Sequence, residues 1–286
     1  MTIRKAVIPA AGWGTRLLPV TKTQPKEMLP IGCMPLIQYA VEEAVEAGIT
    51  DVVIVISPNR QAIVNYFAPA PDLVATLTRK NEHGLLDTLA RLENLANIIY
   101  VTQPEPLGLG HAVALAREAI GDEPFAVILP DDLIDYPESG LRQMLPLFIE
   151  YSASIIAVET VDRQETPKYG IICPRQIHER IHKVEELVEK PEPEAAPSSL
   201  GIVGRYILTP AIFEALAHTA PDSRGEIQLT NALSGLLHQQ AIYALEFQGA
   251  RYDTGTPIGW LEAQVAYGLK HPGFGDKFRN RLRQLI

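Results

Sequence analysis

Short apolar runs alternate with amphipathic segments along the first half of the chain. The almost continuous apolar runs are typical of strands buried on both faces, and they cover residues 6–8, 51–56, 98–102 and 125–129. Apolar side chains at helical spacing predict helices over residues 36–45, 60–66, 85–95 and 112–120. Strands that alternate with helices favour right-handed crossovers, so we expect an α/β fold with a doubly wound, mostly parallel central sheet. Such sheets bind ligands at the carboxyl ends of their strands.

The second half is less regular. Predicted strands there cover residues 153–158, 171–173, 182–188, 202–208 and 241–247. Residues 190–199 are rich in proline and polar side chains and are interpreted as a surface loop. The last thirty or so residues have a helical pattern. We therefore expect one domain over residues 1–286, with small β insertions and residues 256–286 as a helical C-terminal extension.

Composition narrows the possible partners. The chain has 286 residues, 47% of them hydrophobic and 21% charged, which is typical of a globular protein with a large core. A formal net charge of -9 argues against general nucleic-acid binding but leaves room for a local cationic pocket. Cys33 and Cys173 lack a partner motif, and no run resembles a signal peptide or a membrane span. We expect a cytoplasmic protein without nucleic-acid or membrane partners.

The first apolar run ends in a loop of small residues, Ala10-Ala11-Gly12-Trp13-Gly14-Thr15-Arg16. Glycines allow the backbone to approach a ligand, and consecutive N–H groups form a concavity suited to phosphate. Arg16 and Lys26 add two cations nearby. A P-loop is excluded because the chain has no Gly-Lys pair, and a dinucleotide fingerprint is excluded because Leu17 takes the place of its last glycine. The stretch favours a polyphosphate site of another kind.

Carboxylates follow two of the apolar runs. Asp131 and Asp132 come directly after residues 125–129, and Asp253 precedes Gly255. Oxygen ligands of this type suit Mg²⁺, which completes its shell with waters and phosphates. A solvated turn is the alternative for Asp-Asp alone, but two acids at separate strand ends beside a phosphate loop favour a metal site. Spacing does not decide which of Asp131 and Asp132 faces the metal.

Other polar residues also stand at strand ends. Gln103 offers a donor and an acceptor that suit the edge of a pyrimidine base, and Gly108 would let the backbone approach that base. We interpret His111 as structural. Glu189 can accept hydrogen bonds from sugar hydroxyls and Lys190 can pair with a phosphate, although Val188-Glu189-Lys190-Pro191 alone favours a solvated charge pair before a proline loop. No nucleophile motif or zinc cluster occurs, which fits phosphoryl-type transfer.

The order and spacing of many segments resemble the sugar-phosphate nucleotidyltransferases, and most closely the bacterial UTP–glucose-1-phosphate uridylyltransferases. The resemblance begins with Ala10-Ala11-Gly12, Pro25-Lys26-Glu27-Met28-Leu29-Pro30 and Pro35-Leu36-Ile37-Gln38-Tyr39. It continues through residues 107–112, 129–133, 169–171, 187–191, 204–208 and 226–230 to Tyr252-Asp253. This implies a Rossmann-like nucleotidyltransferase fold with its small β insertions on the sugar side, and transfer of a uridylyl group from UTP to glucose 1-phosphate.

The resemblance also implies roles for single residues. The nucleotide-binding residues would be Ala10, Ala11, Gly12, Gly14, Thr15, Gln103 and Gly108. The sugar-binding residues would be Asp132, Gly170, Glu189, Lys190 and Val203. Arg16, Lys26 and Lys190 would be catalytic, and Asp253 would bind Mg²⁺ with Asp131 or Asp132. Family members are commonly homo-oligomers, so we expect the same here.

Two departures from the family pattern stand near the phosphate loop. The run Gly32-Cys33-Met34-Pro35 lacks an acid and a lysine, and Trp13 replaces a smaller aliphatic residue. Two other functions stay open: a thymidylyltransferase acting on a hexose 1-phosphate, and a sugar-nucleotide-binding regulatory module without turnover. The retained acids and lysines favour an enzyme.

Overall fold

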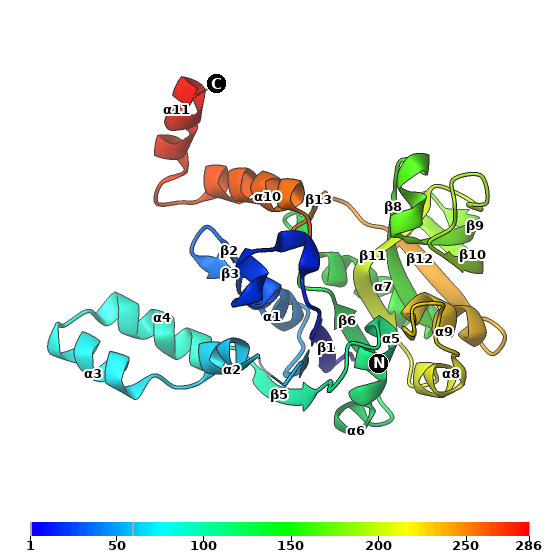
Figure 1. Ribbon diagram of the computed structural model, residues 1–286, viewed down its shortest axis with the longest axis horizontal. Helices are drawn as coiled ribbons and strands as arrows, with labels where there is room; N and C mark the ends of the chain where they lie inside the picture. Colours follow the sequence, from blue (N-terminus) through cyan, green and yellow to red (C-terminus); the bar gives the residue numbers. More distant parts are fainter. Residues whose placement is uncertain (1, 59, 286) are drawn as a thin grey trace.

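The protein is built around a nine-stranded mixed sheet, described by a computed structural model over residues 2–58 and 60–285 (Figure 1). The strand order is β5-β4-β1-β6-β11-β8-β12-β10-β9. These strands are β1 (Lys5–Ala10), β4 (Asp51–Ile56), β5 (Asn97–Thr102), β6 (Phe125–Ile128), β8 (Ser154–Thr160), β9 (Gly170–His178), β10 (Ile181–Glu189), β11 (Leu200–Leu208) and β12 (Ile242–Glu246). Two small ribbons pair β2 (Pro30–Ile31) with β3 (Met34–Pro35), and β7 (Asp132–Asp135) with β13 (Ala250–Asp253).

Strand direction divides the sheet in two. The neighbours in β5-β4-β1-β6 are all parallel, with Lys5 opposite Asp51 in the β1–β4 pair, as the alternating pattern of the first half predicts. Strand β11 is antiparallel to both β6 and β8, and β10 is antiparallel to both β12 and β9. The expectation of a mostly parallel sheet therefore holds for the N-terminal half, and the second half is mainly antiparallel.

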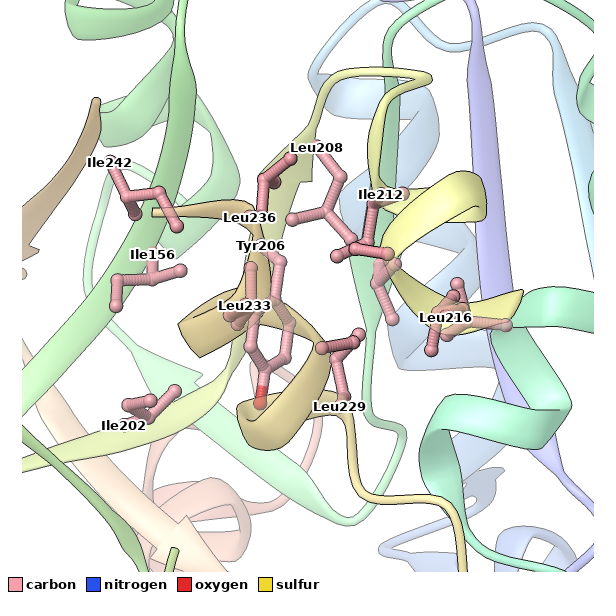
Figure 2. Close-up of a cluster of buried hydrophobic side chains, with 14 of the residues drawn as sticks. Ile156, Ile202, Tyr206, Leu208, Ile212, Leu216, Leu229, Leu233, Leu236 and Ile242 are labelled. Carbon is pink, nitrogen blue, oxygen red and sulfur yellow. The ribbon is translucent and has the colours of Figure 1, made fainter. Parts of the chain in front are cut away.

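Helices cover both faces of the sheet. They are α1 (Leu36–Glu46), α2 (Gln61–Phe67), α3 (Pro71–Arg79), α4 (His83–Glu93), α5 (Leu109–Leu115), α6 (Arg117–Ile120), α7 (Gly140–Tyr151), α8 (Ile212–His218), α9 (Leu229–Leu236), α10 (Pro257–Lys270) and α11 (Gly275–Leu285). Alternate residues of one strand enter different cores: Val7 packs in the cluster of α5, α8 and α9, whereas Ile8 packs in that of α1 and α7. Figure 2 shows the first cluster, with Leu233 and Leu236 of α9 beside Ile156 and Tyr206.

Most predicted elements are present, with shifted ends. The helix expected over residues 112–120 is two helices, α5 and α6, and it begins earlier, at Leu109. Helix α3 is not among the predicted elements; its Pro71 occupies the first helical turn, where a proline is compatible with a helix. Helices α10 and α11 confirm the helical C-terminus, which extends from the body in Figure 1. None of the helices in the described part of the chain has the length and apolarity needed to cross a membrane.

Candidate active site

The loop after β1 is fixed by side chains from two other segments. Gly14 has a left-handed backbone with φ of 66°, and the Thr21 hydroxyl donates a hydrogen bond to its carbonyl at 2.9 Å. The guanidinium of Arg60 donates to the Gly12 carbonyl at 2.7 Å, and this arginine is itself buried. These bonds secure the loop from two sides. Neither Thr21 nor Arg60 belongs to a motif, so the sequence analysis missed both.

Lys26 and Asp131 form an ion pair beside this loop. Lys26 lies in the 3-10 helix η3 (Lys26–Met28), and its ammonium group is in hydrogen-bond contact with the Asp131 carboxylate. Burial by itself would lower the pKa of Lys26, but the attraction of Asp131 and Glu27 and the hydrogen bond to Asp131 together outweigh it, and the pKa is raised. Burial would likewise raise the pKa of Asp131, and Lys26 instead holds it below its usual value. Both groups are therefore charged at neutral pH.

Asp253 faces the same space as Asp131. A Cβ added to Gly255 would lie 2.8 Å from Oδ2 of Asp131 and 3.0 Å from Oδ1 of Asp253, so the two carboxylates converge. Burial raises the pKa of Asp253, and the negative charges of Asp132 and Asp131 raise it further. Arg16, in the 3-10 helix η1 (Thr15–Leu17), forms an ion pair with Asp253 at 3.7 Å, which together with the charge of Arg251 offsets only part of this rise. Two converging oxygen donors with excess negative charge fit a hard divalent cation.

The carboxylate of Asp132 is held by other protein groups. It accepts hydrogen bonds from Nε of Arg251 at 2.6 Å and from the backbone N–H of Gly204 at 3.1 Å. Arg251 also bonds Glu159 and lies over the ring of Tyr169, with its guanidinium carbon 5.2 Å from the ring centroid. This network fixes one wall of a cavity that Asp132 and Arg251 line together with residues of β9, β10 and β11.

A buried ion pair lies beneath the Asp131 loop. Arg205 of β11 is 1% exposed and bonds both carboxylate oxygens of Glu43 on α1, with distances of 2.8 to 3.0 Å. The same guanidinium donates to the carbonyls of Leu129 at 3.0 Å and Asp132 at 2.6 Å. Arg205 therefore holds the backbone on both sides of Asp131, a role that no local sequence pattern announces.

The residues expected at a base also lie together. Gln103 is buried, and its amide nitrogen contacts the Gly108 carbonyl at 3.2 Å and Nδ1 of His111 at 3.0 Å. Those contacts leave its carbonyl oxygen available to a ligand. Gly108 has φ of 95°, and a Cβ there would lie 2.7 Å from the Ile227 carbonyl, so a side chain would be strained and would clash. His111 thus orients Gln103, in line with a structural role.

Two adjoining hollows gather the candidate residues. One, of about 330 Å³, is lined by all five expected sugar-binding residues: Asp132, Gly170, Glu189, Lys190 and Val203. The other, of about 520 Å³, is lined by Ala11, Gly12, Gly14, Thr15, Lys26, Gln103 and Gly108. Asp131 lines both hollows, and Arg16 and Asp253 line the first. Ala10 is buried at the end of β1 and lines neither.

Lys190 has an unusual backbone for its residue type. It follows β10 with φ of 48°, a left-handed conformation that costs a non-glycine residue energy. Its N–H donates to the Tyr169 carbonyl at 2.9 Å, and its ammonium group lies 2.8 Å from Glu189. The strained conformation keeps this cation at the edge of the smaller hollow.

Comparisons with known proteins show which proteins this chain resembles. The model of a family described as nucleotidyl transferase matches residues 5–268. The chain is 46% identical to the UTP–glucose-1-phosphate uridylyltransferase of Bacillus subtilis over 275 residues, covering 96% of this chain and 94% of the relative. It is 45% identical to UTP–glucose-1-phosphate uridylyltransferase 2 of Staphylococcus saprophyticus over 99% of this chain and 98% of the relative.

Solved structures are also similar. A UDP-glucose pyrophosphorylase complexed with UDP-glucose matches with a TM-score of 0.86 and 44% identity, over 94% of this chain and 100% of that structure. UTP-bound UGPase from Acinetobacter baumannii matches with a TM-score of 0.92 and 39% identity over 100% of both chains.

Proposed function

This chain belongs to the UTP–glucose-1-phosphate uridylyltransferases of the nucleotidyl transferase family, and we propose that it converts UTP and α-D-glucose 1-phosphate into UDP-glucose and pyrophosphate. The observation that carries this proposal is that Asp131 lines both hollows, one with phosphate-loop residues and the other with polar groups suited to a sugar. Bound there, the two substrates would meet at the charged centre between the hollows.

The larger hollow takes the nucleotide. Gln103 and the backbone near Ala10, Ala11 and Gly108 read the uracil edge, since the free carbonyl of Gln103 can accept a hydrogen bond from its ring N–H. The backbone of Gly12, Gly14 and Thr15 holds the ribose and phosphates. The smaller hollow takes the sugar: Glu189, Asp132 and the backbone of Gly170 and Val203 bond the hydroxyls, and Lys190 holds the phosphate.

The reaction is an in-line displacement at phosphorus. A phosphate oxygen of glucose 1-phosphate attacks the α-phosphorus of UTP, a new phosphorus–oxygen bond forms, and the bond to the bridging oxygen of pyrophosphate breaks. Arg16 and Lys26 neutralise the triphosphate while Lys190 neutralises the attacking phosphate, which offsets the repulsion between two anions. The half-buried Lys26 is held in place by Asp131, and no side chain has to act as a nucleophile.

Asp131 and Asp253 would hold a divalent cation, which we propose is Mg²⁺. Their converging oxygens and the excess charge at Asp253 support this pair, and the engagement of Asp132 by Arg251 leaves Asp132 to the sugar side. When bound, Mg²⁺ supplies positive charge that stabilises the leaving pyrophosphate.

Pyrophosphate release tests the proposal directly. We would offer UTP, dTTP, CTP, ATP and GTP separately with glucose 1-phosphate and Mg²⁺, and repeat each assay with a chelator. Strong preference for UTP that disappears on chelation is the expected result. Preference for dTTP would make the protein a thymidylyltransferase, and UDP-glucose binding without any release would make it a regulatory module.

We also propose a homo-oligomer and a cytoplasmic location. Free thiols at Cys33 and Cys173 suit a reducing compartment, and cell fractionation tests the location. The continuous sheet supports a single domain over residues 1–286 with residues 256–286 as its extension. Limited proteolysis should then release only the extension.

A further inference from the structure

Trp13 stands unusually free for an aromatic side chain. It lies in the loop between β1 and η1, and 68% of its surface is exposed. Its neighbours on either side, Gly12 and Gly14, have no side chains to cover it. A single exposed apolar residue is common, but an indole is large, and leaving it exposed forgoes the stability that its burial would provide. The place of this indole therefore matters more than its exposure.

That place is the rim of the nucleotide hollow. Trp13 lines the hollow of about 520 Å³ together with Gln103. It also lines a neighbouring hollow of about 540 Å³, together with Pro104 and Pro106 of the loop that follows Gln103. The indole thus stands at the boundary between the phosphate loop and the base-reading loop. The backbone on both sides of Trp13 is fixed, because Arg60 donates a hydrogen bond to the Gly12 carbonyl and Thr21 donates one to the Gly14 carbonyl.

We propose that the indole of Trp13 stacks on the uracil ring of the bound nucleotide and forms one wall of the base site. This proposal rests on the proposed function, which places UTP in the larger hollow. A pyrimidine has polar edges and apolar faces; Gln103 can satisfy an edge but leaves a face in contact with water. A flat, preplaced aromatic ring covers such a face at little conformational cost.

Stacking of this kind has a distinct chemical signature. Every base has a π face, so Trp13 contributes affinity for the nucleoside without selecting among bases. Selection stays with the hydrogen bonds of Gln103. Loss of the indole should therefore lower the affinity for UMP and for UTP by a similar factor, of about tenfold. The affinity for inorganic pyrophosphate should not change.

Intrinsic fluorescence provides the experiment, because the chain has only two tryptophans, Trp13 and Trp260. Trp260 lies on α10 and packs against a core that includes Leu133. It lines neither of the two hollows that Trp13 lines. In Trp260→Phe, emission comes from Trp13 alone, and titration with UMP should quench it. If that variant fails to fold, the difference in emission between the unmodified protein and Trp13→Phe isolates the same signal.

Calorimetry with UMP, UTP and pyrophosphate completes the test. We expect Trp13→Leu to lose affinity for both nucleotides equally, Trp13→Phe to retain most of it, and both variants to bind pyrophosphate normally. If the protein binds UMP but the emission of Trp13 is not quenched, the stacking proposal is wrong. An equal loss of pyrophosphate affinity would also overturn it, because that would indicate a disturbed phosphate loop. Failure of the unmodified protein to bind UTP or UDP-glucose would instead refute the proposed function on which the stack rests.

Discussion

At the residue scale, we expect substitution of Lys190 to affect activity but not stability. We predict that Lys190→Ala lowers kcat/KM by about 10²–10³-fold, because one preplaced charge at the reacting phosphate is lost. Its pair with Glu189 is partly exposed and contributes little to folding, so the melting temperature should hardly change. Lys183→Ala, on the strand β10 that precedes Lys190 but outside both hollows, is the matched control. Full activity in Lys190→Ala would remove this lysine from the site.

The buried carboxyl of Glu27 should make the stability of the fold depend on pH. It is 1% exposed and neither carboxylate oxygen has a hydrogen-bond partner within the described residues. Burial raises its pKa above the 4.5 of a free carboxyl, although Lys26 opposes the shift. As the pH rises above that value, the unfolded chain ionises Glu27 more readily than the folded one does, so folding loses stability until the folded carboxyl also ionises.

Glu27→Gln should therefore raise the melting temperature by a few degrees at pH 8 and by less at pH 5, since the amide never ionises. Thermal unfolding at the two pH values measures this difference. Glu262→Gln on the exposed face of α10 serves as the control. An equal gain at both pH values, or a loss at pH 8, would contradict the prediction.

A functional residue can be predicted from the sequence only when it belongs to a recognisable motif. Glycines, lysines and acids at strand ends form recognisable runs, and nearly all of those residues line the two hollows. Arg60, Arg205 and Arg251 escape notice because each is a lone cation whose partners lie far along the chain. Their buried bonds to Gly12, Glu43 and Asp132 exist only once the sheet has formed.

At the scale of elements, the Arg205–Glu43 pair joins α1, β11 and the loop before β7. We predict that Arg205→Met costs about 3–5 kcal/mol in the free energy of unfolding, because Glu43 is left charged and buried. A double variant, Arg205→Met with Glu43→Leu, should recover much of that stability but little of the activity, since nothing then holds the carbonyls of Leu129 and Asp132. Denaturation and kcat/KM, measured on both variants, test this. Recovery of both together would make the pair merely structural.

Element boundaries show a second limit of sequence reasoning. Apolar runs report burial directly, so the pattern predicted the nine strands of the central sheet, but it missed the short ribbon strands β2, β3, β7 and β13. It missed α3, whose residues are all at least partly exposed and whose Pro71 is compatible with a first helical turn. Strand direction in the second half was equally hidden, because a buried strand looks the same in parallel and antiparallel pairs.

At the scale of the whole molecule, the C-terminal extension is the candidate subunit contact, and a solvated basic helix is the alternative. Ile258, Leu261 and Val265 of α10 are 65%, 53% and 39% exposed, and α11 adds the basic side chains of Lys277, Arg279, Arg281 and Arg283. We predict that light scattering gives a multiple of the 31.4 kDa chain mass, and that a chain truncated before Lys270 has a lower multiple. An unchanged multiple would rule out a contact through α11.

The bond between Lys26 and Asp131 has a thermodynamic consequence for the order in which ligands bind. In the free protein each group neutralises the other, so a triphosphate must compete for Lys26, and a cation must compete for Asp131. Either ligand alone breaks the pair and strands one charge in a buried setting, whereas both together satisfy both charges. Their affinities should therefore be positively coupled, and by reciprocity each strengthens the other by the same factor. The pair therefore disfavours binding of the triphosphate without the cation, or of the cation without the triphosphate.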